Sequence, residues 1–228
     1  MNHTRAVWPA ALVLALALSG CLSDDPESTA ADPAEPIAEQ QDVIADELLT
    51  PYRSASGQFE ISFPATWTVA ETFDGGAVVL ANKQAAMDRY QAGAAPEDAD
   101  LVVNVGFLPA TLFDQRELRR FEVTDDLAPD DYLRAALPIF EPVDGATIGE
   151  VELVSLPDGP EAGAVSVVAP DREGRILALS AGPRVTAIVS MTTAPGQRQD
   201  YDEVVEVIAA ATTFSGDGDA LYGRLLTG

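Results

Sequence analysis

Histidine and cysteine, which most often supply acid–base, nucleophilic and metal chemistry, occur once each in this chain, as His3 and Cys21. Both flank an unbroken apolar run, residues 6–18, which Arg5 precedes. Thirteen apolar residues behind a positive charge are typical of a secretory signal peptide, and they are fewer than the about 20 that span a bilayer. Removal of this signal, residues 1–20, takes His3 with it. We therefore expect a mature chain without Ser–His or Cys–His catalysis and without a histidine-containing metal site.

The residues that end the apolar run, Leu18, Ser19, Gly20 and Cys21, resemble the lipobox of bacterial lipoproteins. The resemblance implies that a signal peptidase recognises Leu18, Ser19 and Gly20, and that Cys21 is lipidated on its sulfur and becomes the first mature residue. Lipid on Cys21 would hold the protein to the outer face of the cytoplasmic membrane, or to the outer membrane if the cell has one. The alternative is an ordinary secretory signal with a leftover thiol, and an unpaired thiol is a liability in an exported protein.

Other constellations that could do chemistry are sparse. No G-x-x-x-x-G-K-[ST] or G-x-G-x-x-G motif occurs, and no cofactor is expected. The one lysine, Lys83, falls on a predicted polar helix face and is expected to be solvated. The densest acidic clusters, residues 97–100 and 217–219, do not continue with the glycine and distal glutamate of an EF-hand loop, which favours solvated loops over calcium sites. Two of the 37 acidic residues could still serve a hydrolase that needs only a carboxylate pair.

The charge of the chain restricts its partners. The formal net charge is −24, and loss of Arg5 with the signal gives 12 − 37 = −25 for the mature protein. Such a charge repels phosphate backbones and anionic headgroups, so nucleic acid is not expected as a partner, nor is a basic patch that docks on the membrane. Two interpretations remain open: a solvating surface that prevents association, and an acidic surface that captures a cationic partner.

The chain divides into a targeting segment, a tether and one domain. Residues 22–50 contain nine acidic residues, no basic ones and three prolines, a composition that cannot bury enough apolar surface to fold. We predict a signal peptide at 1–20, the lipidated cysteine with a disordered acidic linker at 21–50, a single domain at 51–214 and a flexible tail at 215–228.

The domain begins with a strand whose apolar residues alternate with polar ones. Residues 58–63 place Phe59, Ile61 and Phe63 on one face of a half-buried strand. Further strands are predicted at 67–73 and 77–81, joined by a turn at 74–76, and at 101–108, 147–156, 164–168, 175–181 and 185–192.

Helices are predicted at residues 83–90, 112–120 and 129–137, with another close to the end of the domain. In the third of these, Pro129 suits the first helical turn and Asp130 and Asp131 suit its dipole. The last one carries an apolar stripe made of Tyr201, Val204, Val205, Ile208 and Ala211. Strands joined by short turns with helices at intervals predict an α+β fold, an antiparallel β-sheet flanked by helices.

The opening of the domain resembles PsbP-like domains. The residues that carry the resemblance are Tyr52, residues 57–61, Pro64 and Trp67, followed by Asn104-Val105 and by a last helix that closes on Thr213-Phe214. The resemblance covers residues 52–214 and implies an α-β-α sandwich. Its members include an extrinsic subunit of photosystem II, a regulator of a nuclear-transport GTPase and bacterial envelope lipoproteins. Their shared theme is binding without catalysis.

The predicted function is that of a membrane-anchored, extracytoplasmic lipoprotein that is not an enzyme and serves as a protein-interaction module of the cell envelope. Its partners are then the membrane, through lipid on Cys21, and an unidentified envelope protein. Two alternatives stay open: a small-ligand binder or carrier, which needs a deep apolar pocket of about 300 Å³ or more, and a carboxylate-dependent hydrolase.

Overall fold

The computed structural model describes residues 49–55, 57, 59–72, 77–109, 128–137, 145–182 and 185–214. The predicted signal peptide, the linker up to residue 48, the helix predicted at 112–120 and the tail after residue 214 lie outside these ranges. The acidic cluster at 217–219 does so too.

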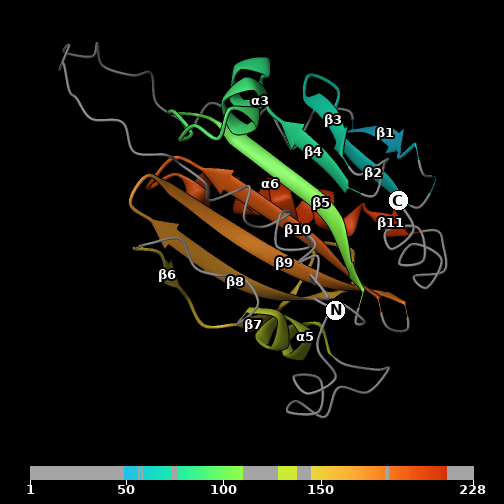
Figure 1. Ribbon diagram of the computed structural model, residues 1–228. Coiled ribbons are helices and arrows are strands. Elements are labelled where there is room, and N and C mark those ends of the chain that lie inside the picture. Colours follow the sequence, from blue (N-terminus) through green and yellow to red (C-terminus); the bar gives the residue numbers. More distant parts are fainter. Residues whose placement is uncertain are drawn as a thin grey trace, which may run out of the picture.

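Two antiparallel sheets and three helices make up the described part of the chain (Figure 1). The larger sheet has eight strands in the order β3-β4-β5-β10-β9-β8-β6, with β7 also paired to β8, and the smaller sheet has the order β1-β2-β11. The strands are β1 (Leu49–Arg53), β2 (Phe59–Pro64), β3 (Thr68–Thr72), β4 (Ala77–Ala81), β5 (Leu101–Pro109), β6 (Thr147–Ile148), β7 (Glu152–Ser155), β8 (Glu161–Ala169), β9 (Arg172–Gly182), β10 (Val185–Thr193) and β11 (Thr213–Phe214), and the helices are α3 (Gln84–Gln91), α5 (Pro129–Ala136) and α6 (Arg198–Ala210).

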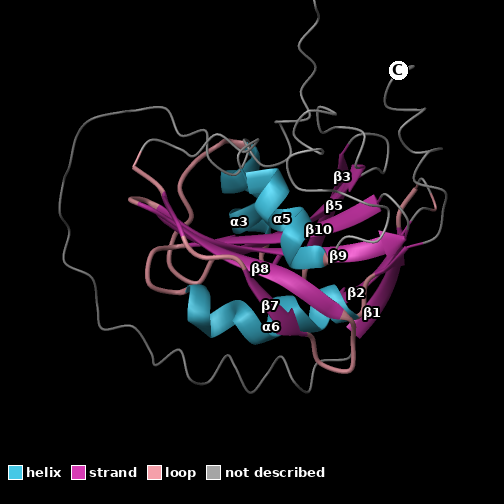
Figure 2. Ribbon diagram, turned by 90° about the horizontal axis from the view of Figure 1, so that it is seen from below, coloured by secondary structure: helices cyan, strands magenta, loops and turns pink. Residues whose placement is uncertain are grey.

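The elements form layers around the larger sheet (Figure 2). Helices α3 and α5 lie on one face, which we call the outer face, and α6 with the smaller sheet lies on the opposite, inner face. The predicted α+β class, an antiparallel sheet flanked by helices, is confirmed by this arrangement.

The predicted alternation in β2 places its apolar residues in the main core. Phe59 and Ile61 are 0% exposed and Phe63 is 5% exposed, whereas Glu60 faces solvent. Each such side chain contributes about 1.5–3 kcal/mol on burial. Trp67, which follows the strand, joins the same core. This cluster lies between the larger sheet and α6, and it fixes the smaller sheet in place.

Helix α6 supplies the other side of that core. Tyr201, Val204, Val205 and Ile208 are buried as the stripe predicted. Ala211 is not part of the buried stripe, because the helix ends at Ala210 and Ala211 is its half-buried C-cap.

Helix α5 packs unusually close to the sheet. Pro129 occupies its first turn with Asp130 and Asp131, as predicted. A Cβ atom on Gly163 of β8 would lie 2.6 Å from the Pro129 carbonyl oxygen and from the Asp130 Cα atom. Glycine at residue 163 therefore sets the distance between α5 and the outer face.

Several boundaries differ from the prediction, and β8 and β9 each begin three residues before the predicted start. The strand expected at 147–156 is split into β6 and β7, because Ile148 pairs with Val167 while Glu152 pairs with Ala164, which leaves one extra residue between them. Strand β1 begins at Leu49, inside the predicted linker, where pairing with β2 outweighs the polar composition. Strand β11 closes the smaller sheet through Phe214, which pairs with Phe59.

Candidate functional site

The most highly connected charged group of the described residues is the Asp100 cluster, made of Lys83, Arg89, Glu97 and Asp100. The Asp100 side chain is 1% exposed. Arg89 donates from Nε to Asp100 Oδ2 at 2.7 Å and from Nη2 to Asp100 Oδ1 at 2.8 Å. Lys83 Nζ lies 2.9 Å from Asp100 Oδ1, and the Glu97 N–H donates to Oδ2 at 2.9 Å. Both carboxylate oxygens are therefore fully engaged.

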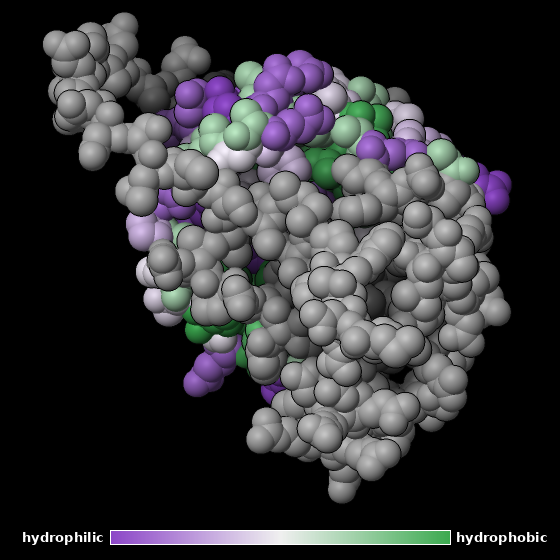
Figure 3. All heavy atoms as spheres, viewed as in Figure 1, coloured by the Kyte–Doolittle hydropathy of each residue, from purple (hydrophilic) through white to green (hydrophobic). Residues whose placement is uncertain are grey.

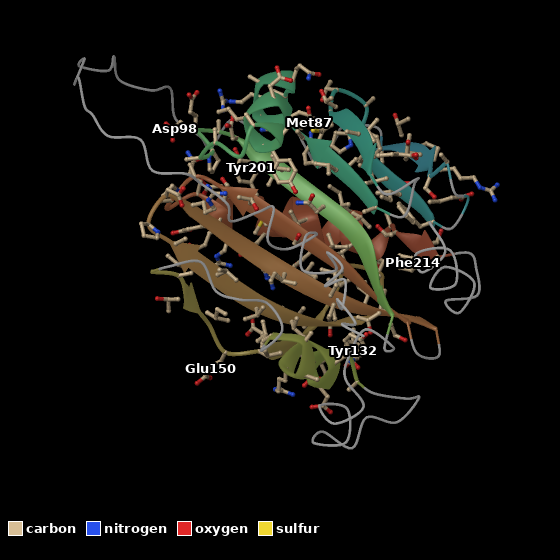
Figure 4. All side chains as sticks on the ribbon, in the orientation of Figure 1. Met87, Asp98, Tyr132, Glu150, Tyr201 and Phe214 are labelled. Atoms are coloured by element: carbon tan, nitrogen blue, oxygen red, sulfur yellow. The ribbon has the colours of Figure 1, made fainter. Side chains whose placement is uncertain are left out.

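Three connections between elements meet at this cluster. Lys83 is the N-cap of α3, Arg89 lies in its last turn and Asp100 immediately precedes β5. Gln197, which precedes α6, accepts the Ala99 N–H at 3.0 Å and donates to Asp98 Oδ1 at 2.7 Å. Figure 4 shows Asp98 at this end of the larger sheet, where β5 begins.

The electrostatics of the Asp100 cluster oppose catalysis and metal binding. Burial raises the pKa of Asp100, but hydrogen bonds from Arg89, the Glu97 N–H and Lys83 lower it by more than burial raises it. The pKa of Asp100 therefore lies below its ordinary value. The carboxylate stays ionised and has no free lone pair directed at a ligand. No metal-capable group of three or more His, Cys, Asp or Glu occurs among the described residues.

Two sequence expectations for this cluster hold only in part. In the expected solvated loop at 97–100, Glu97 and Asp98 are exposed, but Asp100 is buried and held by two cations. The side chain of Lys83, expected to be solvated, is 41% exposed and forms an ion pair with Asp100. Sequence could not bring these residues together, because the loop fold that joins them depends on Gln197, almost 100 residues away.

A second group of ion pairs, the α6 cluster, attaches α6 to β9. Arg175 Nη1 of β9 lies 2.6 Å from Glu206 Oε1 and 3.5 Å from Asp202 Oδ1, and Arg198 Nη1 lies 2.7 Å from Asp202 Oδ2. Burial, together with the charge of Glu206, raises the pKa of Asp202 above its ordinary value against the effect of the two arginines. Asp202 and Glu206 are one helical turn apart, as a hydrolase pair could be, but both are bound to arginine.

The outer face of the larger sheet carries a buried amide without a full set of partners. Asn104 of β5 is 5% exposed, and its Oδ1 accepts a hydrogen bond from the Tyr90 hydroxyl at 2.8 Å. Its Nδ2 has no hydrogen-bond partner among the described residues, and a buried donor left unpaired costs about 1–3 kcal/mol. Sequence analysis noted Asn104 only through the PsbP resemblance, because a polar residue within an apolar strand pattern does not indicate which face it occupies.

All seven basic residues within the described ranges are ion-paired with a carboxylate. The same ranges contain 18 acidic residues, so their net charge is 7 − 18 = −11. The cations are Arg53, Lys83, Arg89, Arg134, Arg172, Arg175 and Arg198. The described surface therefore presents unpaired carboxylates and no unpaired cation.

Some of these unpaired carboxylates lie along the β7 edge, which we define as residues 150–155 with Asp158 and Glu161. Glu150, Glu152, Asp158 and Glu161 are exposed and form no ion pair with a described residue. Leu153, between them, is 47% exposed. Figure 4 shows Glu150 directed away from the sheet at this rim, and Figure 3 shows hydrophilic side chains that project there beside hydrophobic ones.

The residues predicted to carry the lipid anchor, Leu18, Ser19, Gly20 and Cys21, lie outside the described residues, so lipidation stays a prediction. Within the described ranges, no helix is long and apolar enough to cross a membrane.

Comparison with known proteins gives matches at the level of structure alone. No protein-family model matches the chain, and no curated protein matches it. Similar solved structures include cyanobacterial PsbP from Synechocystis sp. PCC 6803, at 14% identity and a TM-score of 0.39 over 73% of this chain and 92% of that one. The Ran-binding protein Mog1p of Saccharomyces cerevisiae matches at 10% identity and a TM-score of 0.43, over 74% and 96% of the two chains.

LpqN of Mycobacterium tuberculosis, described as involved in cell envelope biogenesis, matches at 14% identity and a TM-score of 0.39, over 81% of this chain and 100% of that one. This chain spans 49% of another matched protein, from Bacteroides thetaiotaomicron. The PsbP family, which the opening strand resembles, is thus represented among similar structures. With TM-scores below 0.5, the fold assignment rests on the sheets and helices of this chain itself.

Proposed function

We propose that the protein is a lipoprotein, anchored to a membrane through Cys21, whose PsbP-like α+β domain serves as a non-catalytic protein-interaction module of the cell envelope. The observation that carries this proposal is the pairing of every described cation with a carboxylate. A surface of unpaired carboxylates repels nucleic acid and anionic headgroups and attracts cationic protein surfaces.

The ion-pair clusters also favour binding over catalysis. A catalytic carboxylate needs a free lone pair or a mobile proton at the reacting atom. In the Asp100 cluster both oxygens accept hydrogen bonds from cations, and in the α6 cluster each carboxylate is bound to an arginine. These groups hold helices α3 and α6 on the sheet.

The acidic linker supports display at a distance from the membrane. A flexible chain of the length that precedes β1, residues 22–48, would reach about 30 Å, and its like charges would extend it further. Repulsion between the acidic domain and anionic lipids acts in the same direction. Anchoring would therefore come from acyl chains on Cys21 rather than from contact between the domain and the bilayer.

The anchor is tested by the Cys21→Ser variant expressed in the native cells. We expect the variant to stay unprocessed or to leave the membrane fraction, and intact mass measurement of the wild type to show acylated Cys21 at the mature start. Unchanged membrane retention of the variant, or a bare thiol at Cys21 in the wild type, would refute the anchor.

The interaction role is tested by crosslinking in intact cells followed by purification of the anchored protein. We expect the same partner in repeated experiments, with less of it as the salt concentration rises during crosslinking, because charge attraction is screened. Repeated recovery of the protein without any partner would count against the interaction role.

A further inference from the structure

We infer that the β7 edge binds an extended, basic segment of a partner protein as an added β-strand. This inference rests on the proposed function and names the surface and the partner chemistry for it. It combines three observations on the described residues: backbone groups of β7 that no described residue pairs with, carboxylates beside them that form no ion pair with a described residue, and the lower availability of the edges at β3 and β1.

Among the described strands, β7 is paired on one side only. Strand β7 pairs with β8 from Glu152 opposite Ala164 to Ser155 opposite Glu161. The next pair in this register is hydrogen-bonded, with the Leu156 N–H donating to the Pro160 carbonyl at 3.2 Å. Hydrogen-bonded pairs alternate in an antiparallel ladder, so Leu153 and Ser155 direct their N–H and C=O groups away from β8. No described residue pairs with the outward groups of Leu153 and Ser155, whereas the Val151 carbonyl, at the start of the edge, accepts a hydrogen bond from Arg134 Nη2 at 3.1 Å.

The side chains along β7 suit a basic, partly apolar strand. Cross-strand neighbours lie about 4.5–5.5 Å apart, which brings a lysine or arginine of an added strand within reach of Glu152. Glu150, just before the strand, is exposed without an ion pair to a described residue. Leu153, 47% exposed on the opposite face of the strand from Glu152, offers an apolar contact for the alternate residues.

The other edges of the sheets are less available. At the opposite edge of the larger sheet, Glu71 of β3 accepts hydrogen bonds from the Tyr52 hydroxyl at 2.5 Å and from the Ala55 N–H at 2.7 Å, which brings the chain after β1 over this edge. In β1, the edge strand of the smaller sheet, Pro51 removes a backbone donor.

The charge on β7 selects against a second copy of this chain. Two β7 edges paired together would place glutamates of one copy beside glutamates of the other, which is unfavourable. Carboxylates on an edge strand are a common protection against self-association. The same carboxylates leave a strand of opposite charge as the favoured occupant.

The test uses the full-length protein in neutral detergent micelles and a labelled peptide that alternates valine and lysine. Fluorescence anisotropy should show saturable binding that weakens as salt rises to about 0.2 M. The control peptide has the same sequence with N-methyl groups on alternate backbone nitrogens, which keep the charge and block strand pairing. We expect at least a tenfold weaker affinity for the control peptide.

Variants locate the site. Glu150→Gln with Glu152→Gln should weaken binding of the unmodified peptide about tenfold, whereas the matched pair Glu173→Gln with Glu203→Gln, on β9 and α6, should change it less than about twofold. Equal affinity for the two peptides, or equal effects of the two variant pairs, would show non-specific charge attraction and overturn the inference. Loss of affinity confined to the β7 pair and the N-methylated peptide would support it.

The same variants separate this inference from the proposed function. In intact cells, Glu150→Gln with Glu152→Gln should reduce crosslinking to the partner while membrane anchoring stays unchanged. If the partner is captured equally by this variant and the wild type, the interaction role stands and the β7 edge is not its surface.

Discussion

Replacement of Asp100 by asparagine should destabilise the domain strongly, because it removes the charge that two cations surround. Asp100→Asn keeps the shape of the side chain but places an NH2 group opposite donors from Arg89 and Lys83. Breaking a buried ion pair by removing one partner costs about 3–5 kcal/mol. Because the side chains of Arg89 and Lys83 are 23% and 41% exposed and can regain water, we expect about 2–3 kcal/mol.

The measurement is urea unfolding of the full-length protein at pH 7, together with thermal unfolding, where this loss corresponds to a Tm lower by about 4–12 °C. The matched control is Asp158→Asn, which removes the same charge from an exposed position. Its φ of +48° is a conformation that asparagine tolerates well, so its free energy of unfolding should change by less than about 0.5 kcal/mol.

The pH dependence gives an independent check on the same residue. The pKa of Asp100 in the folded protein lies below its ordinary value of 3.8, so its stabilising effect is complete above that value and is lost as the pH falls through the folded pKa. The difference between wild type and Asp100→Asn should be constant from pH 7 to about pH 4.5 and shrink at lower pH. A loss of stability no larger than that of Asp158→Asn at pH 7 would refute the role assigned to the cluster.

Three further predictions follow from the described contacts. Asp202→Asn should lower the free energy of unfolding by less than about 1 kcal/mol at pH 7, because burial raises the pKa of Asp202 and the folded state disfavours its charged form. Urea unfolding from pH 4 to pH 7 should show the wild type gaining stability relative to the variant as the pH falls. Gly163→Ala should lower the free energy of unfolding by more than about 2 kcal/mol, because the new Cβ atom would lie 2.6 Å from backbone atoms of α5. Gly149→Ala, whose new Cβ atom would lie 3.4 Å from its nearest neighbour, should lower it clearly less in the same experiment. Glu71→Gln should lower the pKa of Tyr52 from about 12 toward 10.0 without reaching it, since burial is the first cause of the raised pKa and the Glu71 carboxylate is the second. The measurement is an absorbance titration with the Tyr52→Phe variant as reference. An unchanged pKa of Tyr52 would show that Glu71 is not its partner.

Local pattern predicted the elements that bury a regular face. One side of β2 and one side of α6 face the core, which produces the alternation of Phe59, Ile61 and Phe63 and the stripe from Tyr201 to Ile208. Such a periodicity can be read from residues that are close in the sequence. Strand β2 was predicted to within one residue at each end. The buried stripe of α6 was predicted except for Ala211, because a helix end depends on capping rather than on periodicity.

Elements defined by pairing were not predictable in this way. The extra residue that separates β6 from β7 has meaning only in register with β8, and a continuous apolar–polar pattern conceals it. Strand β1 contains Pro51 and follows a polar linker, so its own residues argue against a strand that pairing with β2 nevertheless forms. Glu71, which joins β3 to the segment after β1, likewise gave no signal.

The candidate sites show the same division between local and distant information. The acidic run at residues 97–100 was visible in the sequence, but the cations that bind Asp100 come from α3, and the Gln197 that fixes the loop comes from the start of α6. A carboxylate is a solvated charge or a buried anchor according to those distant partners. Composition therefore predicted the negative charge of the described surface, but it did not indicate that Asp100 is buried.

The placement of charge connects stability to the proposed binding role. The side chains of Arg89 and Arg175 are largely buried and hold α3 and α6 on the sheet through carboxylates. The acids left without such partners lie on the surface, and on β7 they lie beside backbone groups that no described residue pairs with. Because every described cation is already paired with a carboxylate, a partner must bring its own positive charge. Carboxylates on an edge strand protect it from pairing with a like-charged strand. On the β7 edge the same carboxylates should favour pairing with a partner strand that carries positive charge.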